Sequence, residues 1–232
     1  MRARALIGRL LARTSAKRGR ELGGARVVFD YLHAELPRGG RILEIGPKHG
    51  LDTRLLATLE PRELVTVDLP EKADEVASWL PEIPVARHVE ANVLHLSEQE
   101  RAELGRFDLV WCLGVLYHNV EQLRLLRRLY ELTAENGLVV VESATTRNRI
   151  LAGRNVVELH WPDTYRSVPT ITHLPSRRAI ASWLEMVGFA DVRIREVYSR
   201  SLGWQRAVLT GRREPGRSAY AGYGVYAAGT AD

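Results

Sequence analysis

The stretch GRILEIGPKHG, residues 40–50, decides the fold. Its first seven residues form a short apolar run that is typical of a buried strand, and Gly46 then lets the backbone turn sharply. LDTRLLATL (51–59) follows directly with apolar residues at helical spacing. A strand, a glycine turn and a helix in this order predict one unit of a parallel α/β sheet, with ligand contacts beyond the carboxyl end of the strand.

The same alternation continues along the chain. Further strands are expected at 63–68, 85–93, 107–114 and 137–143, and further helices at 25–36, 71–80, 97–104 and 121–133. Ser97 and Glu100 have the spacing of a capping box, which marks one helix start. Five strands alternating with helices predict a mostly parallel sheet covered on both faces.

The pattern changes after the fifth strand. Residues 144–175 lack clear periodicity, and so long an irregular segment predicts a functional loop or lid. A helix at 176–189 and two strands within 190–212 are then expected to close the domain as an antiparallel hairpin.

Charge is concentrated at one end of the chain. The 232 residues carry a net charge of +5, but residues 1–20 contain seven Arg or Lys and no acid, so the remainder is −2. We therefore expect a basic arm at 1–24, a domain at 25–213 and a loose Gly/Ala/Tyr tail at 214–232. A single cysteine excludes an intrachain disulfide, and no apolar run approaches the ~20 residues of a membrane span. These features favour a cytoplasmic protein, with a homo-oligomer as an open option.

An acidic residue ends the strand that follows the glycine turn. Asp68 ends the second expected strand, 22 residues after Gly46, where a carboxylate can accept hydrogen bonds from both hydroxyls of a ribose. The dinucleotide fingerprint is absent, because Lys48 stands where that pattern requires a second glycine.

The glycine turn, Asp68 and the order of the seven strands together resemble the class I S-adenosylmethionine-dependent methyltransferases. The resemblance implies a Rossmann-like seven-stranded sheet with its last strand antiparallel, and S-adenosylmethionine as cofactor. In that fold the glycine turn lies against the methionine part, the acid binds ribose and the end of the third strand meets the adenine. The implied cofactor residues are Glu44, Gly46, Lys48, Gly50, Asp68, Leu69, Asn92, Val93, Leu113 and Gly114.

Three segments carry a narrower resemblance: CLGVLYHNVEQL (112–123), ITHLPSRRAIASWLEMVGFADVRI (171–194) and QRAVLTGRR (205–213). They are similar to the tRNA wobble-uridine carboxymethyltransferases, which use a carboxylated S-adenosylmethionine. That resemblance implies that Tyr117 and Arg206 help to hold the extra carboxylate. The family also has a long N-terminal region, whereas about 40 residues precede the first strand here. Tyr117 and Arg206 equally suit an ordinary substrate pocket.

Candidate catalytic residues gather after the fourth and fifth strands. His118 is the first candidate for a general base and His160 the second, because a neutral imidazole accepts protons near pH 7. Glu142 ends the fifth strand and is expected in the same crevice. The expected substrate residues are Tyr117, Glu158, Trp161, Asp163, Tyr165 and Arg206. The alternatives are a structural hydrogen bond for each histidine and core packing for Trp161 and Tyr165.

A metal is a further option. Glu142, Glu158 and Asp163, with His160 and His173 nearby in the sequence, offer ligands that suit Mg²⁺. Cys112 lies within a strand and is interpreted as a buried small hydrophobe.

These observations predict an O-methyltransferase that acts on a hydroxyl of a small polar acceptor, a sugar or oligosaccharide above all, by in-line transfer assisted by a histidine base. Two alternatives remain. One is a methyl- or carboxymethyltransferase of the tRNA wobble uridine, with the basic arm gripping phosphates. The other is a cofactor-binding module without catalysis.

Overall fold

A computed structural model describes residues 24–148, 150–165, 169–198 and 205–216. The expected arm at 1–24 and tail at 214–232 lie almost wholly outside the described residues. Within the helices that the structure does describe, none is long and apolar enough to cross a membrane.

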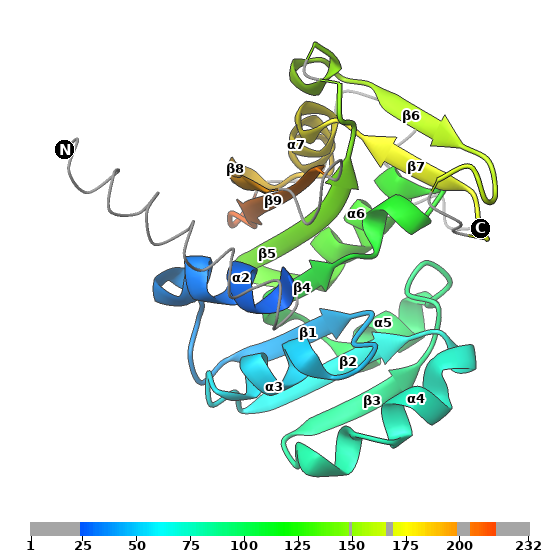
Figure 1. Cartoon of the computed structure of the whole chain (residues 1–232). Coiled ribbons are helices and arrows are strands. Elements are labelled where there is room, and N and C mark those ends of the chain that lie inside the picture. Colours follow the sequence, from blue (N-terminus) through cyan, green and yellow to red (C-terminus); the bar gives the residue numbers. More distant parts are fainter. Residues whose placement is uncertain (1–23, 149, 166–168, 199–204, 217–232) are drawn as a thin grey trace.

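A seven-stranded sheet in the order β3-β2-β1-β4-β5-β9-β8 forms the centre of the protein (Figure 1). Its strands are β1 Arg41–Ile45, β2 Glu63–Asp68, β3 Ala86–Glu90, β4 Phe107–Leu113, β5 Thr133–Thr145, β8 Ala190–Tyr198 and β9 Gln205–Arg212. The first five strands pair in parallel, and β9 is antiparallel to both β5 and β8. The predicted sheet and its single antiparallel strand are confirmed.

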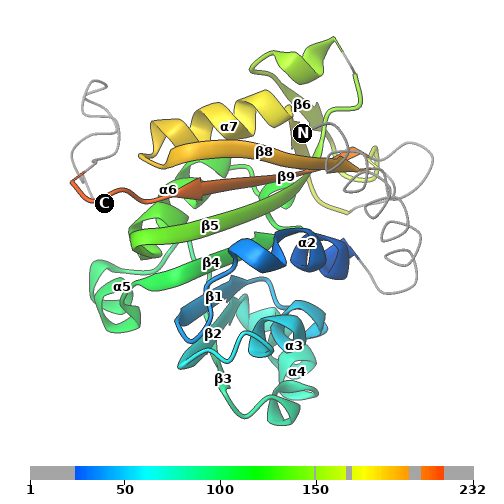
Figure 2. The ribbon, with the colours of Figure 1, turned by 90° about the vertical axis from the view of Figure 1, so that its left-hand side faces the viewer.

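Helices cover both faces of this sheet (Figure 2). On one face lie α2 Gly24–Leu32, α3 Leu51–Ala57 and α4 Ala73–Ala77, and on the other α5 Glu98–Leu104, α6 Gln122–Leu132 and α7 Arg177–Met186. Side chains of the strands pack into a separate hydrophobic core on each face of the sheet, because successive side chains point to opposite faces. In β1, Ile42 packs with the α2 and α3 side and Leu43 with the opposite side.

Short 3₁₀ helices replace parts of the expected elements. They are η1 His33–Glu35, η2 Pro70–Lys72, η3 Leu80–Glu82, η4 Leu116–His118 and η5 Leu151–Gly153. The helix expected at 71–80 is divided into η2, α4 and η3. Pro81 has no backbone N–H to donate, so the α-helix cannot continue through it. The capping box at Ser97 and Glu100 is present as predicted.

The expectation of an irregular segment at 144–175 is wrong in part. β5 continues to Thr145, and two four-residue strands, β6 Val157–His160 and β7 Thr172–Pro175, pair as a small antiparallel sheet. This β6–β7 hairpin stands beyond the end of β5, outside the main sheet (Figure 1). Strands of four residues with mixed polarity leave too short a pattern for periodicity to reveal.

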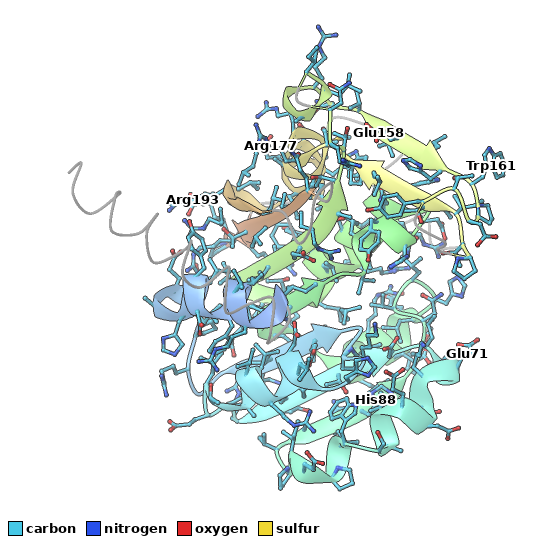
Figure 3. The ribbon with its side chains drawn as sticks, in the orientation of Figure 1. Glu71, His88, Glu158, Trp161, Arg177 and Arg193 are labelled. Atoms are coloured by element: carbon cyan, nitrogen blue, oxygen red, sulfur yellow. The ribbon has the colours of Figure 1, made fainter. Side chains whose placement is uncertain are left out.

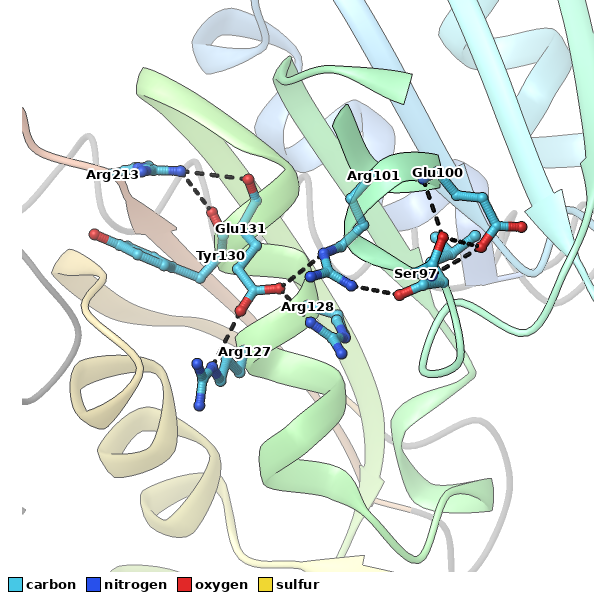
Figure 4. A network of polar contacts seen from close by, with 9 residues as sticks. Ser97, Glu100, Arg101, Arg127, Arg128, Tyr130, Glu131 and Arg213 are labelled. Atoms are coloured by element: carbon cyan, nitrogen blue, oxygen red, sulfur yellow. Dashed lines mark hydrogen bonds and ion pairs between the residues drawn. The ribbon is translucent and has the colours of Figure 1, made fainter. Parts of the chain in front are cut away.

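A charged cluster joins α5 to α6 (Figure 4). Glu131 pairs with Arg101 of α5 at 3.4 Å and with Arg127 and Arg128 of its own helix at 3.1 and 2.6 Å. Arg213, just after β9, donates to backbone carbonyls at the C-terminal end of α6. The network joins the two helices on one face of the sheet and ties the C-terminal end of α6 to the end of β9.

Candidate functional site

The turn between β1 and α3 needs glycine at two positions. Gly46 has a φ of +74° and donates its N–H to the Val67 carbonyl at 2.9 Å, and a Cβ there would lie 2.7 Å from Val115 Cγ2. Gly50 has a φ of +69°, and a Cβ there would lie 2.5 Å from the Trp79 ring. Contacts below 3.0 Å leave no room for a side chain, and left-handed backbone disfavours one.

Carboxyl groups surround this turn. Glu44 on β1 is 2% exposed, and its Oε2 is buried with no hydrogen-bond partner among the described residues. Burial raises the pKa of Glu44 well above its ordinary value, and the nearby carboxylates of Asp52 and Asp68 raise it further. A buried carboxyl with an unused oxygen, next to two more acids, suits a cationic ligand.

The ends of β2 and β3 lie next to each other, as the cofactor interpretation requires. Asp68 Oδ1 accepts a hydrogen bond from the Leu69 N–H at 2.9 Å, and the Leu69 side chain is 43% exposed. The Asp68 carbonyl accepts from the Ala91 N–H at 2.9 Å, which brings the turn at Asn92 and Val93 beside it. The Asp68 carboxylate and the exposed Leu69 side chain therefore lie together where the ribose and the adenine are expected.

The turn after β4 carries His118. Gly114 has a φ of +77° and donates its N–H to the Glu142 carbonyl at 3.0 Å, and the chain then forms η4, which ends at His118. The His118 ring lies 3.9 Å from the Tyr117 ring, between centroids. Desolvation lowers the pKa of His118, and the positive charges of Arg206 and Lys48 lower it further. A pKa below the ordinary value keeps the imidazole neutral near pH 7. His118 is exposed as a residue, so the ring is open to a ligand.

Arg206 and Glu142 form a buried ion pair. Their side chains are 3% and 4% exposed, Arg206 Nη2 lies 2.5 Å from Glu142 Oε2, and Arg206 Nε contacts Glu142 Oε1. The Arg206 guanidinium also lies 5.0 Å from the centroid of the Tyr117 ring. Burial alone would lower the pKa of Arg206, but Glu142 and Tyr117 raise it. Glu142 therefore neutralises an arginine, and its expected catalytic role stays a prediction.

The β6–β7 hairpin brings some expected substrate residues to this turn. Tyr165 packs beside the buried cluster of Tyr117, Ala144 and Leu174. Gln122 Nε2 donates to the carbonyls of Leu116 and His173, both at 3.0 Å, and so ties the hairpin to the His118 turn.

The second candidate base, His160, and the expected substrate residues Glu158, Trp161 and Asp163 lie on β6 and just after it. His160 Nε2 is 3.7 Å from Glu158 Oε2, its ring is 5.2 Å from that of Tyr165, and Thr146 Oγ1 donates to Glu158 Oε1. Trp161 is 73% exposed and points away from the body of the protein (Figure 3). Asp163 is also exposed and has a φ of +63°.

The suggested Mg²⁺ site is wrong as a cluster. In the part of the chain that the structure describes, no three His, Cys, Asp or Glu side chains come close enough to hold a metal ion. Among the suggested ligands, Glu142 is paired with Arg206 and Glu158 accepts from Thr146. Cys112 is buried, and burial raises the pKa of its thiol to about 12, which confirms the interpretation as a small hydrophobe.

Sequence reasoning missed Trp79. Its indole N–H donates to the Lys48 carbonyl at 2.8 Å, and the ring lies against Gly50. The available signal was a tryptophan at the end of the helix that follows Asp68, but its partner could not be read from spacing alone.

The fold and the turn define a class of protein. The chain matches the family described as a methyltransferase domain over residues 15–194, and it belongs to that family. The expected class, an S-adenosylmethionine-dependent methyltransferase, is confirmed at the level of the family.

Individual relatives agree with this assignment. The chain is similar to the tRNA U34 carboxymethyltransferase of Psychromonas ingrahamii, with 33% identity over 116 residues, which is 50% of this chain and 34% of that protein. It thus spans about a third of the length of this relative.

Solved structures share the fold. The N-terminal domain of EvdMO1 with bound S-adenosylhomocysteine has a TM-score of 0.61 and 20% identity, over 87% of this chain and 97% of that one. The 1,6-didemethyltoxoflavin-N1-methyltransferase of Burkholderia thailandensis has a TM-score of 0.60 and 21% identity, over 92% and 89%.

Proposed function

We propose that this chain transfers a methyl group from S-adenosylmethionine to a hydroxyl of a small polar acceptor, a sugar or oligosaccharide, with His118 as general base. The position of His118 carries the proposal. It is an exposed imidazole at the carboxyl end of β4, close enough to Lys48 of the glycine turn for that charge to lower its pKa. In open α/β sheets this edge is where ligands bind.

The residues around the turn fit the proposed cofactor. The unused Oε2 of Glu44 and the carboxylates of Asp52 and Asp68 favour a ligand with positive charge. In this proposal Asp68 accepts hydrogen bonds from ribose hydroxyls. S-adenosylmethionine supplies an activated methyl group, so the protein has mainly to hold the acceptor oxygen in line with it.

His118 supplies the remaining step in this mechanism. A hydroxyl attacks poorly while it keeps its proton, and a positioned base that removes it contributes about 10²–10⁴-fold. Because burial, and then the charges of Arg206 and Lys48, hold the pKa of His118 below its ordinary value, the imidazole is in its proton-accepting form at neutral pH. Tyr117 packs against the ring and limits its orientation.

The Arg206–Glu142 pair supports an uncarboxylated cofactor. A second carboxylate on the ligand would gain most from an arginine whose charge is uncompensated. Here two of the guanidinium nitrogens, Nε and Nη2, already face the oxygens of Glu142. The pair therefore leaves fewer guanidinium donors for a further anion.

A panel of acceptors tests the proposal. The purified chain is incubated with S-adenosylmethionine and a set of sugars and oligosaccharides, and release of S-adenosylhomocysteine is measured. We expect release with at least one hydroxylated acceptor and methylation at oxygen by mass spectrometry. Release only with amine or thiol acceptors would contradict the O-methyl assignment.

A tRNA acceptor is the second candidate, favoured by the 33% identity to a tRNA U34 carboxymethyltransferase. The same assay with bulk tRNA, and with either S-adenosylmethionine or its carboxylated form, distinguishes the two. If tRNA is the acceptor, deletion of residues 1–20 should weaken RNA binding, and that binding should fall steeply with salt. Cofactor binding without turnover on any acceptor would instead indicate a non-catalytic module.

A further inference from the structure

The carbonyl groups of the glycine turn are held from outside by side chains of the following elements. Trp79, between α4 and η3, donates its indole N–H to the Lys48 carbonyl at 2.8 Å. Arg54 of α3 donates from Nη1 to the His49 carbonyl at 3.1 Å and to the Gly50 carbonyl at 3.0 Å. Three successive carbonyls of the turn are thus bound by two side chains, neither of which was expected to serve the site.

These two side chains are themselves fixed. Trp79 is 5% exposed, and its ring lies so close to Gly50 that a Cβ would approach it to 2.5 Å. Arg54 pairs with Glu82 at 2.5 Å, and its guanidinium lies 6.0 Å from the centroid of the Trp79 ring. The His49 imidazole also contacts Glu75 of α4 at 2.5 Å. Residues up to 31 positions away in sequence therefore hold the turn in place.

These hydrogen bonds fix the orientation of the peptide groups in the turn. In a planar trans peptide the carbonyl and the following N–H point in opposite directions. When the Lys48 carbonyl faces Trp79, the His49 N–H faces the other side of the turn. Lys48 itself has a φ of +49°, a left-handed conformation that an L-residue keeps only where its surroundings hold it.

We propose that Trp79 and Arg54 are positioning residues for cofactor binding, which form an outer clamp that holds the 48–50 turn in its ligand-binding shape. They act through the backbone of the turn and touch no ligand. The clamp also sets the place of Lys48, whose charge acts on His118. This inference rests on the proposed cofactor site, but it does not depend on which acceptor is methylated.

Titration calorimetry with S-adenosylhomocysteine tests the clamp. Trp79→Phe keeps an aromatic ring and removes the indole N–H, so the Kd should rise about three- to tenfold, as for one lost hydrogen bond. Arg54→Met, which removes two carbonyl contacts, should raise the Kd at least as much, and Arg54→Lys should restore part of the affinity. Trp183→Phe on α7 is the matched control, because Trp183 packs against the far core, and it should leave the Kd within about twofold.

Thermal melts of the same variants separate positioning from folding. Trp79→Phe and Trp183→Phe should lower the Tm by similar amounts, while only the first weakens binding. An unchanged Kd in Trp79→Phe and Arg54→Met, with wild-type protein binding normally, overturns the clamp. Failure of the wild-type protein to bind S-adenosylhomocysteine overturns the cofactor site itself, and the clamp with it.

Discussion

Gly39 and Gly50 offer a matched pair for testing how tightly the cofactor turn is built. Both have left-handed backbone, with φ of +68° and +69°. A Cβ at Gly39 would meet nothing within 4 Å, whereas a Cβ at Gly50 would lie 2.5 Å from the Trp79 ring. Alanine at either position incurs the same backbone strain, and only Gly50→Ala adds a steric clash.

The expected magnitudes follow from these two terms. Left-handed backbone costs an L-residue roughly 1–2 kcal/mol. Overpacking against a buried group that cannot move aside adds about 1–3 kcal/mol. Gly39→Ala should therefore lower the free energy of unfolding by about 1–2 kcal/mol and Gly50→Ala by about 2–5 kcal/mol. For a domain of this size each kcal/mol corresponds to roughly 2–4 °C in Tm.

Urea denaturation measures the two free energies, and calorimetric titration with S-adenosylhomocysteine measures the effect on the site. Gly39→Ala should bind the ligand like the wild type, while Gly50→Ala should bind it far more weakly. Equal destabilisation by the two substitutions, or normal binding by Gly50→Ala, would refute the view that Trp79 and the turn are packed against each other as described.

Three further predictions concern the ion pair, the histidine and a helix start. Glu142→Gln should lower the free energy of unfolding by about 3–5 kcal/mol, because it leaves a buried arginine without its partner, whereas Asp30→Asn in an exposed pair should change it by less than about 1 kcal/mol. Activity should rise with pH through the pKa of His118, with its midpoint below the ordinary value of about 6.5. Lys48→Met should move that midpoint to higher pH, because it removes a charge that disfavours the imidazolium. Ser97→Ala should cost about 1 kcal/mol in urea denaturation through loss of the capping box.

Much of the fold could be predicted because its signals are local. The strands appear as short apolar runs, and the helix at Gln122–Leu132 has apolar residues at helical spacing. The alternation of strands with helices predicts that the strands run parallel. β6 and β7 could not be predicted, because each has four residues and gains its stability from pairing with the other. These two strands depend on contacts between segments that are distant in sequence, and a local sequence pattern does not show such contacts.

The same distinction applies to the site. Gly46, Gly50 and Asp68 were identifiable because a turn and a strand end impose residue types at fixed spacing. The role of Trp79 depends on a hydrogen bond to a carbonyl 31 residues earlier, which no spacing rule reveals. The pairing of Glu142 with Arg206 was hidden for the same reason. They are 64 positions apart in the sequence and meet because β9 pairs with β5.

In the proposed mechanism His118 removes the proton of an acceptor hydroxyl at an intact S-adenosylmethionine site. The direct measurement compares wild type and His118→Ala for turnover, read as S-adenosylhomocysteine release, and for the Kd of S-adenosylhomocysteine. This role predicts that turnover falls about 10²–10⁴-fold while the Kd changes by less than about threefold, under one kcal/mol. Turnover that persists at the wild-type level in His118→Ala would contradict it.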